Sequence, residues 1–152
     1  MSADLILPDL VSLLNDAARE AEGLAARLRE AVAGRVAPDG RVDRKLLDAE
    51  QHVAHGLAWA ASYAETLRQT AAWASALSAQ GRFGEAEALP AQLLAFEYLS
   101  QLVGGVPMNQ GEMFRPGDLD VDAQALAPVI ARLRPGASQA VKARIIELLA
   151  EA

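Results

Sequence analysis

The chain has 152 residues, with 14 basic and 20 acidic side chains and a formal net charge of −6 at pH 7. This length fits one domain, and the acidic excess argues against nucleic-acid binding because no basic face outweighs it. The absence of cysteine excludes disulfides, thiolate catalysis and cysteine-based zinc sites. No apolar run reaches the ~18 residues of a membrane span and no secretory leader opens the chain, so we expect a cytoplasmic protein.

The composition favours an all-α fold, in a single helical domain over residues 1–152. Alanine carries much of the apolar content, while only 5% of the residues are aromatic. Small side chains allow helices to approach closely, whereas a sandwich or barrel needs β-branched and aromatic strands. We predict a helical bundle of about five helices, with one very long helix and a long ordered loop at 104–122.

The first predicted helix begins near Pro8 and runs to about Ala33. Proline suits the first turn of a helix, and apolar residues then recur at every third or fourth position. Gly34 is the predicted stop. The sequence Pro38-Asp39-Gly40 that follows is typical of a turn, because proline presets φ and glycine accepts a positive φ.

Asp43 is a suitable N-cap for a second helix, which meets no proline before its predicted end at Gln80. At 1.5 Å per residue this helix would span more than about 50 Å, longer than a domain of this size needs. It is therefore either broken or extended against a partner surface, and we favour the second alternative. Gly56 lies beside the apolar stripe and would allow a neighbouring helix to approach closely.

The third predicted helix runs from Glu85 to Val103, and Gly104-Gly105 ends it. Pro90 lies too deep for the first turn, so we expect a kink or a late start there. A short helix capped by Asp122 is expected to reach Leu133, interrupted or kinked at Pro128.

Pro135-Gly136 separates that helix from the last one, Ser138–Glu151, with Ser138 as its cap. The side chains expected to be buried are those of Val141, Ile145, Leu148 and Leu149.

The segment 104–122, GGVPMNQGEMFRPGDLDVD, interrupts the helical pattern. Flexible linkers and disordered tails lack apolar side chains, which this segment retains, and loops of this length are usually functional if ordered. We predict an ordered docking element, oriented by Arg115. Its anchors would be Met108, Met113 and Phe114.

Trp59, Tyr63 and Trp73 lie on the second predicted helix and are interpreted as core or interface packing. Trp59 and Tyr63 are four residues apart, on neighbouring turns of the same face. Aromatic side chains are enriched in interface cores, so we also consider Trp59 and Tyr63 candidate contacts to a partner.

His52 and His55 share a helix face with Asp48, a spacing that would suit part of a metal site. The alternative is a polar face that meets solvent or a neighbouring subunit, and we predict no metal in this chain. No nucleophile elbow or phosphate-binding loop occurs. Glu97 and Glu112 would form a catalytic pair only through an unknown tertiary arrangement, so we predict no catalytic residue.

Four basic residues near the end of the chain are candidates for binding the phosphates of a nucleotide or of coenzyme A. They are Arg132, Arg134, Lys142 and Arg144. The alternative is a solvated edge that complements a helix C-terminus before Pro135.

The run AEQHVAHGLAWAASYAETLRQTAAWA at 49–74, followed by GRFGEAEAL and EYLSQLVGGVPMNQGEMFRPGDL, resembles a known family. It is similar to the N-terminal helical extension of methylsuccinyl-CoA dehydrogenase-like acyl-CoA dehydrogenases. The resemblance covers about residues 43–119, and its most specific parts are HGLAW at 55–59 and the segment 104–116. Pro90 departs from the pattern, because we expect a helix-forming residue there.

The resemblance implies a parent enzyme that oxidises a branched dicarboxylic acyl-CoA thioester to an enoyl-CoA, with FAD and a glutamate base. No flavin-binding or catalytic motif can be carried over to this chain, which would be an excised domain or a free-standing relative. We therefore expect a non-catalytic module that packs on dehydrogenase domains or subunits, as a homo-oligomer. The alternatives are a module that binds an acyl-CoA or acidic metabolite through Arg115 and the basic group at 132–144, and a metal-dependent hydrolase around His52 and His55.

Overall fold

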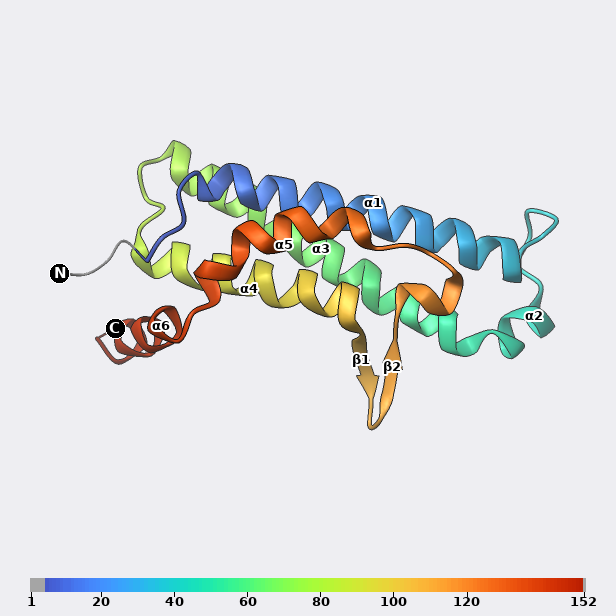
Figure 1. Ribbon diagram of the computed structural model, residues 1–152. Coiled ribbons are helices and arrows are strands. Elements are labelled where there is room, and N and C mark those ends of the chain that lie inside the picture. Colours follow the sequence, from blue (N-terminus) through green and yellow to red (C-terminus); the bar gives the residue numbers. More distant parts are fainter. Residues whose placement is uncertain (1–4, 152) are drawn as a thin grey trace.

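Three long antiparallel helices make the body of the molecule, shown for residues 5–151 by a computed structural model (Figure 1). They are α1 (Leu10–Val36), α3 (Gln51–Ala79) and α4 (Glu85–Gly104). The shorter helices are α2 (Arg44–Ala49), α5 (Ala127–Leu133) and α6 (Gln139–Glu151). The predicted all-α bundle is confirmed, with 6 α-helices in the described range and a single two-stranded hairpin. None of the helices described is both long and apolar enough to cross a bilayer.

Helix α1 begins and ends a few residues later in the sequence than predicted. It begins at Leu10, after Asp9 in the left-handed region with φ of 52°, and it continues through Gly34 to Val36. Nothing lies within 4 Å of the position a Gly34 side chain would occupy, so that glycine faces open space. Val32 and Val36 are both buried and keep the last turn helical against the core, which overrides the glycine stop.

The prediction of one unbroken helix from Asp43 to Gln80 is wrong. Asp43 does cap a helix, accepting the N–H groups of Lys45 and Leu46 at 2.7 and 3.1 Å. That helix is the short α2, and the chain bends at Glu50, with φ −104° and ψ 23°, before α3 begins. The break resolves the excess length, because the 29 residues of α3 span only ~44 Å.

Helix α4 starts at Glu85, so the late start considered for Pro90 does not occur. The backbone N–H of Gly84 donates to Glu87 Oε2 at 3.0 Å and closes the first turn. Proline removes one helical hydrogen bond, which would have reached the Ala86 carbonyl. Ala86 is exposed, so water can satisfy that oxygen and the helix passes through Pro90.

The segment 104–122 is ordered, but it is not a loop. It forms an antiparallel hairpin of β1 (Val106–Asn109) and β2 (Glu112–Phe114), followed by the 3₁₀ turn η1 (Pro116–Leu119). The predicted start of the next helix at Asp122 is also wrong. The Asp122 carboxylate accepts from the Gln124 N–H at 2.8 Å, but this opens a second 3₁₀ turn, η2 (Gln124–Leu126), and Pro128 falls in the first turn of α5.

The C-terminal part continues through η3 (Arg134–Ala137) into α6. Ser138 caps α6 as predicted, because its Oγ accepts the Val141 N–H at 3.3 Å. The predicted burial of Leu149 is wrong, since 74% of its surface is exposed. Of the α6 side chains only Val141 is fully buried, because α6 lies at one end of the bundle and packs mainly on α4 (Figure 1).

Among residues 5–151, Gln92 is the polar side chain that is fully buried in the apolar core. Its Oε1 accepts the Leu7 N–H at 3.0 Å, and its Nε2 donates to the carbonyls of Leu5 and Gly136 at 2.8 and 3.2 Å. A buried polar group must be hydrogen-bonded to be tolerated, and this amide uses both its donor and its acceptor. Gln92 thereby fixes the N-terminal segment and η3 to α4.

Candidate interaction site

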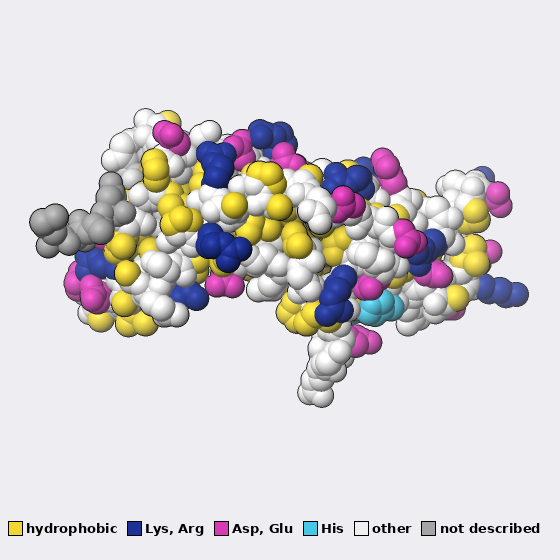
Figure 2. All heavy atoms as spheres, viewed as in Figure 1, with side chains coloured by type: hydrophobic (Ala, Val, Ile, Leu, Met, Phe, Trp, Pro, Cys, Tyr) yellow, Lys and Arg dark blue, Asp and Glu magenta, His cyan; other side chains and the backbone are white. Residues whose placement is uncertain are grey.

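The hairpin projects from the side of the bundle at the point where α4 ends (Figures 1 and 2). Gly105 allows the exit from α4, because its φ of 136° is rarely adopted by other residues. Gly111 provides the turn between the strands with φ of 76°. These two glycines convert the end of a helix into a projecting element.

The base of the hairpin is anchored in the core by alternate side chains. Val106 and Met108 of β1 are buried while Pro107 and Asn109 are exposed, as the period of a strand requires. Phe114 of β2 is completely buried. A Cβ atom on Gly56 of α3 would overlap the Phe114 ring, so the strand lies directly against the helix backbone.

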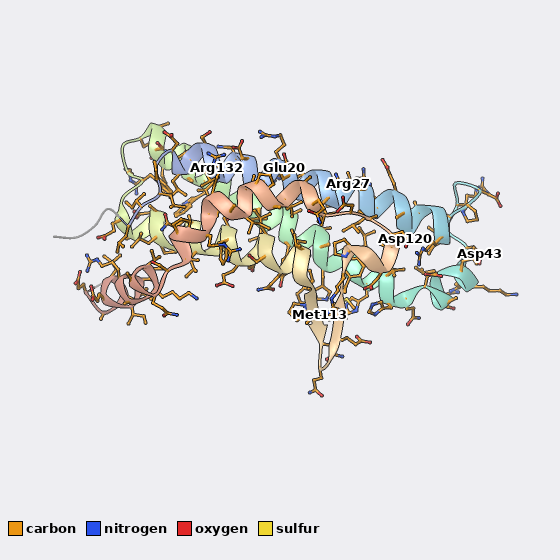
Figure 3. All side chains as sticks on the ribbon, viewed as in Figure 1. Glu20, Arg27, Asp43, Met113, Asp120 and Arg132 are labelled. Atoms are coloured by element: carbon orange, nitrogen blue, oxygen red, sulfur yellow. The ribbon has the colours of Figure 1, made fainter. Side chains whose placement is uncertain are left out.

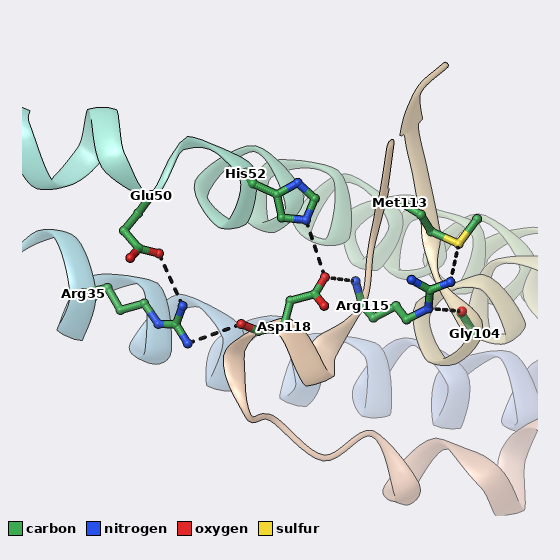
Figure 4. Close-up of polar contacts among 7 residues, drawn as sticks. All are labelled: Arg35, Glu50, His52, Gly104, Met113, Arg115 and Asp118. Atoms are coloured by element: carbon green, nitrogen blue, oxygen red, sulfur yellow. Dashed lines mark hydrogen bonds and ion pairs between the residues drawn. The ribbon is translucent and has the colours of Figure 1, made fainter. Parts of the chain in front are cut away.

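Arg115 holds the base of the hairpin against the end of α4 (Figure 4). Its Nε donates to the Gly104 carbonyl at 3.2 Å and its Nη2 lies 3.1 Å from Met113 Sδ. Met113 covers Gly105, where a Cβ would overlap its thioether. Figure 3 shows Met113 at this base, and 39% of its surface remains exposed.

Asp118 of η1 connects the hairpin to α1 and α3, as Figure 4 shows. One of its carboxylate oxygens accepts the Arg115 N–H at 2.8 Å and lies 3.5 Å from His52 Nε2 of α3. Its backbone carbonyl accepts from Arg35 of α1 at 3.3 Å, and Arg35 also pairs with Glu50 at 3.3 Å. The hairpin is therefore held in a defined orientation.

The two histidines have separate partners, so the structure does not bring them together. His52 faces Asp118, whereas His55 accepts a hydrogen bond from Trp59 Nε1 at 3.1 Å. Within residues 5–151 no group of three or more potential ligands is arranged to hold a metal ion.

Trp59 and Tyr63 occupy different environments. The Tyr63 hydroxyl donates to Gln101 Oε1 of α4 at 2.6 Å, and its ring stacks on Tyr98 with centroids 4.3 Å apart. Burial, with a smaller effect of Tyr98, raises the pKa of Tyr63. Trp59 is 37% exposed, so it remains available to a partner, whereas Tyr63 joins α3 to α4.

The four basic candidates do not converge on one site. Arg132 of α5 pairs with Asp16 of α1 at 3.0 Å, and Lys142 lies 3.5 Å from Glu97. The Arg134 guanidinium lies 5.7 Å from the centre of the Phe96 ring. Arg132 is therefore held by α1, whereas Lys142 and Arg134 contact two consecutive residues of α4.

Arg144 joins α6 to α4 through two hydrogen bonds to Glu85, at 2.9 and 3.1 Å. It also pairs with Glu147 at 3.1 Å and Glu151 at 3.4 Å. The Arg144 guanidinium holds the pKa of Glu85 below its ordinary value. The Arg144 guanidinium is therefore already paired with carboxylates and is not free to bind a phosphate.

Three features of this site were not predicted from the sequence. They are the packing of Phe114 on Gly56, the contacts of the Asp118 carboxylate with Arg115 and His52, and the contact of the Asp118 carbonyl with Arg35. Gly56 carried a signal, because a glycine inside an alanine-rich helix indicates close approach of another backbone or side chain. The approaching element is a hairpin and not the helix we expected. The contacts of Arg35 and Asp118 join residues 83 positions apart, and no local pattern reveals them.

The comparisons with known proteins give one informative match. No family model matches the chain. The chain is 42% identical over 150 residues to (2S)-methylsuccinyl-CoA dehydrogenase of Cereibacter sphaeroides. The match takes in 98% of this chain and 27% of the relative, so the chain spans about a quarter of the relative's length. The predicted resemblance to methylsuccinyl-CoA dehydrogenase-like enzymes is confirmed, and the share matched is consistent with an N-terminal extension.

Proposed function

We propose that this chain is a non-catalytic helical interaction module of, or related to, an FAD-dependent acyl-CoA dehydrogenase. It packs on the dehydrogenase core or its oligomer in the cytoplasm. The observation that carries this proposal is the extent of the match: nearly the whole chain aligns with a quarter of the dehydrogenase relative. In this proposal the flavin and the catalytic base belong to the remaining three quarters.

The surface we assign to this contact is the base of the hairpin, the adjoining end of α4 and the exposed edge of α3. It contains Met113, Val103 and Trp59, whose exposed fractions are 39%, 42% and 37%. Figure 2 shows hydrophobic side chains gathered at the hairpin base, beside a basic side chain. Apolar side chains on a rigid projecting element favour binding, because little conformational entropy is lost when the partner is bound.

Met108 and Phe114 pack in the core under the hairpin and hold this surface in place. Both are buried within the chain, so they would act by fixing the hairpin and not by touching a partner. Arg115 is exposed and would orient Met113 through its contact with the thioether.

The alternative, a module that binds an acyl-CoA or another acidic metabolite, has weaker support. A groove of about 420 Å³ lies between α4, η1 and α5, and Arg134 is the one basic candidate that lines it. Arg132, Lys142 and Arg144 are engaged with carboxylates elsewhere. A thermal-shift experiment with acyl-CoA esters separates the two functions, because only the alternative predicts stabilisation by the ester alone.

The direct test uses purified dehydrogenase, prepared as the part of the Cereibacter sphaeroides relative that lies outside the match. Titration of this chain into that protein in a calorimeter should give saturable binding. Met113→Asp places a charge in the apolar contact and should weaken binding at least ~10-fold. Val42→Asp is the matched control, since Val42 is 66% exposed in the α1–α2 connection and should leave binding unchanged.

Two results would contradict the proposal. One is the absence of any heat or co-sedimentation at about 100 μM of both proteins, far above the dissociation constant of a specific complex. The other is an equal loss of binding for Met113→Asp and Val42→Asp, which would indicate a contact on a different face.

A further inference from the structure

A second surface lies on α1 and α3, away from the hairpin. The two helices run side by side, and their outward faces leave a shallow groove of about 490 Å³. Its floor is apolar and mostly alanine, with Leu57 as the largest side chain. Its α1 rim carries two opposite charges, Glu22 and Arg29, on either side of Ala25 and Ala26.

Glu22 and Arg29 differ from most other charged residues of the long helices, because neither forms an ion pair within residues 5–151. Arg19, Arg35 and Arg68 all have a carboxylate within 4.0 Å. Seven residues separate Glu22 from Arg29, a rise of ~10.5 Å, so the two cannot reach one another along the helix. Both line the groove, although the charge of Glu22 is near enough to Arg68 of α3 to help raise the pKa of that guanidinium.

We infer that this groove binds a second copy of the same chain, with the α1 and α3 helices of the two copies antiparallel. A two-fold axis that lies in the interface, perpendicular to α1 and level with the midpoint between Ala25 and Ala26, brings Glu22 of each copy to Arg29 of the other. Such an isologous arrangement forms two equivalent ion pairs. The two charged residues that α1 contributes to the groove are therefore complementary under this axis.

The residues that α3 contributes to the groove are compatible with the same two-fold axis. Its lining residues run from Ala54 to Glu65, and their centre lies between Ala58 and Ala61. The axis then places Ala58 opposite Ala61 of the second copy and Glu65 opposite Ala54. No like charges meet among these lining residues, and the alanines allow the helices of the two copies to approach closely.

The groove is small for a permanent dimer. Stable complexes bury about 800 Å² per partner. We expect a short stretch of two alanine-rich helices to bury less surface than most such complexes. We therefore expect an association that depends on protein concentration in the isolated chain. This inference concerns self-association through α1 and α3, so it does not rest on the proposed contact between the hairpin and a dehydrogenase.

The test is charge reversal, followed by sedimentation equilibrium of the full chain from about 5 to 500 μM. Glu22→Arg and Arg29→Glu each replace two attractive pairs by two repulsive ones, and each should raise the dimer dissociation constant at least ~10-fold. The double variant Glu22→Arg/Arg29→Glu restores both pairs with the charges exchanged, and should return the constant to within ~3-fold of the original. Glu30→Arg is the matched control, because it makes the same charge change on an exposed part of α1 outside the groove.

The absence of cysteine in the chain allows a second, geometric measurement. Ala26→Cys lies beside the proposed axis and should form a disulfide dimer on mild oxidation, whereas Glu30→Cys should not. A chain that stays monomeric up to about 500 μM would overturn the inference. So would a dimer whose dissociation constant ignores both single reversals, or equal oxidation of the two cysteine variants.

Discussion

The Phe114 ring lies on the backbone of Gly56, where β2 packs against α3. Both residues are fully enclosed, and the overlap of a Gly56 Cβ with the ring shows that no side chain fits between them. The absence of a side chain on α3 thus decides where the hairpin sits. Since the exposed Met113 precedes Phe114 directly, this contact also decides how the proposed docking surface is presented.

Gly56→Ala should therefore destabilise the chain, although alanine is the better helix former by ~1 kcal/mol. Overpacking of a filled core costs about 1–3 kcal/mol, which exceeds that gain in propensity. Gly23→Ala is the control, because Gly23 lies in the middle of α1 and its added Cβ would meet only an arginine terminus at 3.8 Å. Urea unfolding should show opposite signs for the two substitutions, and stabilisation by both would mean that the ring can move aside.

Phe114→Ala and Met113→Ala should separate the fold from the proposed docking. Removal of a fully buried phenylalanine costs roughly 3–5 kcal/mol, because it leaves a cavity under the hairpin. Met113 is more than one-third exposed, so its truncation should change stability by less than about 1 kcal/mol. The measurements are thermal unfolding and titration with the dehydrogenase; a stability loss for Met113→Ala as large as that for Phe114→Ala would place both side chains in the core.

The sequence predicted the helices because their apolar spacing is regular, and it predicted the caps at Asp43 and Ser138 because those signals are local. It failed where distant contacts decide the structure. The bend at Glu50 contains no proline or glycine, and there Arg35 of α1 pairs with the Glu50 carboxylate. The apolar spacing of α6 likewise predicted burial for Leu149, but no other element of the described chain covers that side of the helix.

The sequence predicted where the candidate site lies in the chain, but it did not predict that the segment forms a β-hairpin. The apolar residues between the glycines of segment 104–122 indicated an ordered element. Their alternate burial in a strand became evident only with the α3 surface present, because three or four residues are too short to show a reliable period. The basic group at 132–144 could not be resolved from sequence, since its carboxylate partners lie on α1 and α4.

Gln92→Leu should destabilise the chain by roughly 2–4 kcal/mol, although leucine is the more apolar residue. The substitution removes a donor and an acceptor from the core and leaves the Leu7 N–H and the Gly136 carbonyl without partners, each worth about 1–3 kcal/mol when buried. Hydrogen exchange should accelerate most in the segment preceding α1. Gln124→Leu, on the exposed face of η2, is the control and should change stability by less than ~0.5 kcal/mol. A neutral or stabilising effect of Gln92→Leu would mean that water replaces the amide.

Asp16 makes the stability of the α1–α5 contact dependent on pH. The guanidinium of Arg19 and then that of Arg132 lower the pKa of Asp16 from its ordinary value of 3.8. A carboxyl group whose pKa is lower in the folded chain stabilises the fold at pH values above 3.8, and this contribution is lost as the pH falls through the folded pKa. Both guanidinium partners of Asp16 are more than half exposed, so solvent screens the two pairs and the contribution is at most ~1 kcal/mol.

The corresponding experiment compares the free energy of unfolding of the original chain with that of Asp16→Asn, from pH 7 downward. The original chain should be more stable by a constant amount at neutral pH, and the difference should shrink below pH 3.8 as the carboxyl group becomes protonated. Salt at about 1 M should reduce the difference at neutral pH, because it screens exposed charges. Glu30→Gln removes a carboxylate from the same helix that forms no ion pair within residues 5–151, and should show no comparable difference. A difference for Asp16→Asn that stays constant down to pH 2 would mean that the hydrogen-bonding shape of the side chain, and not its charge, holds α5 to α1.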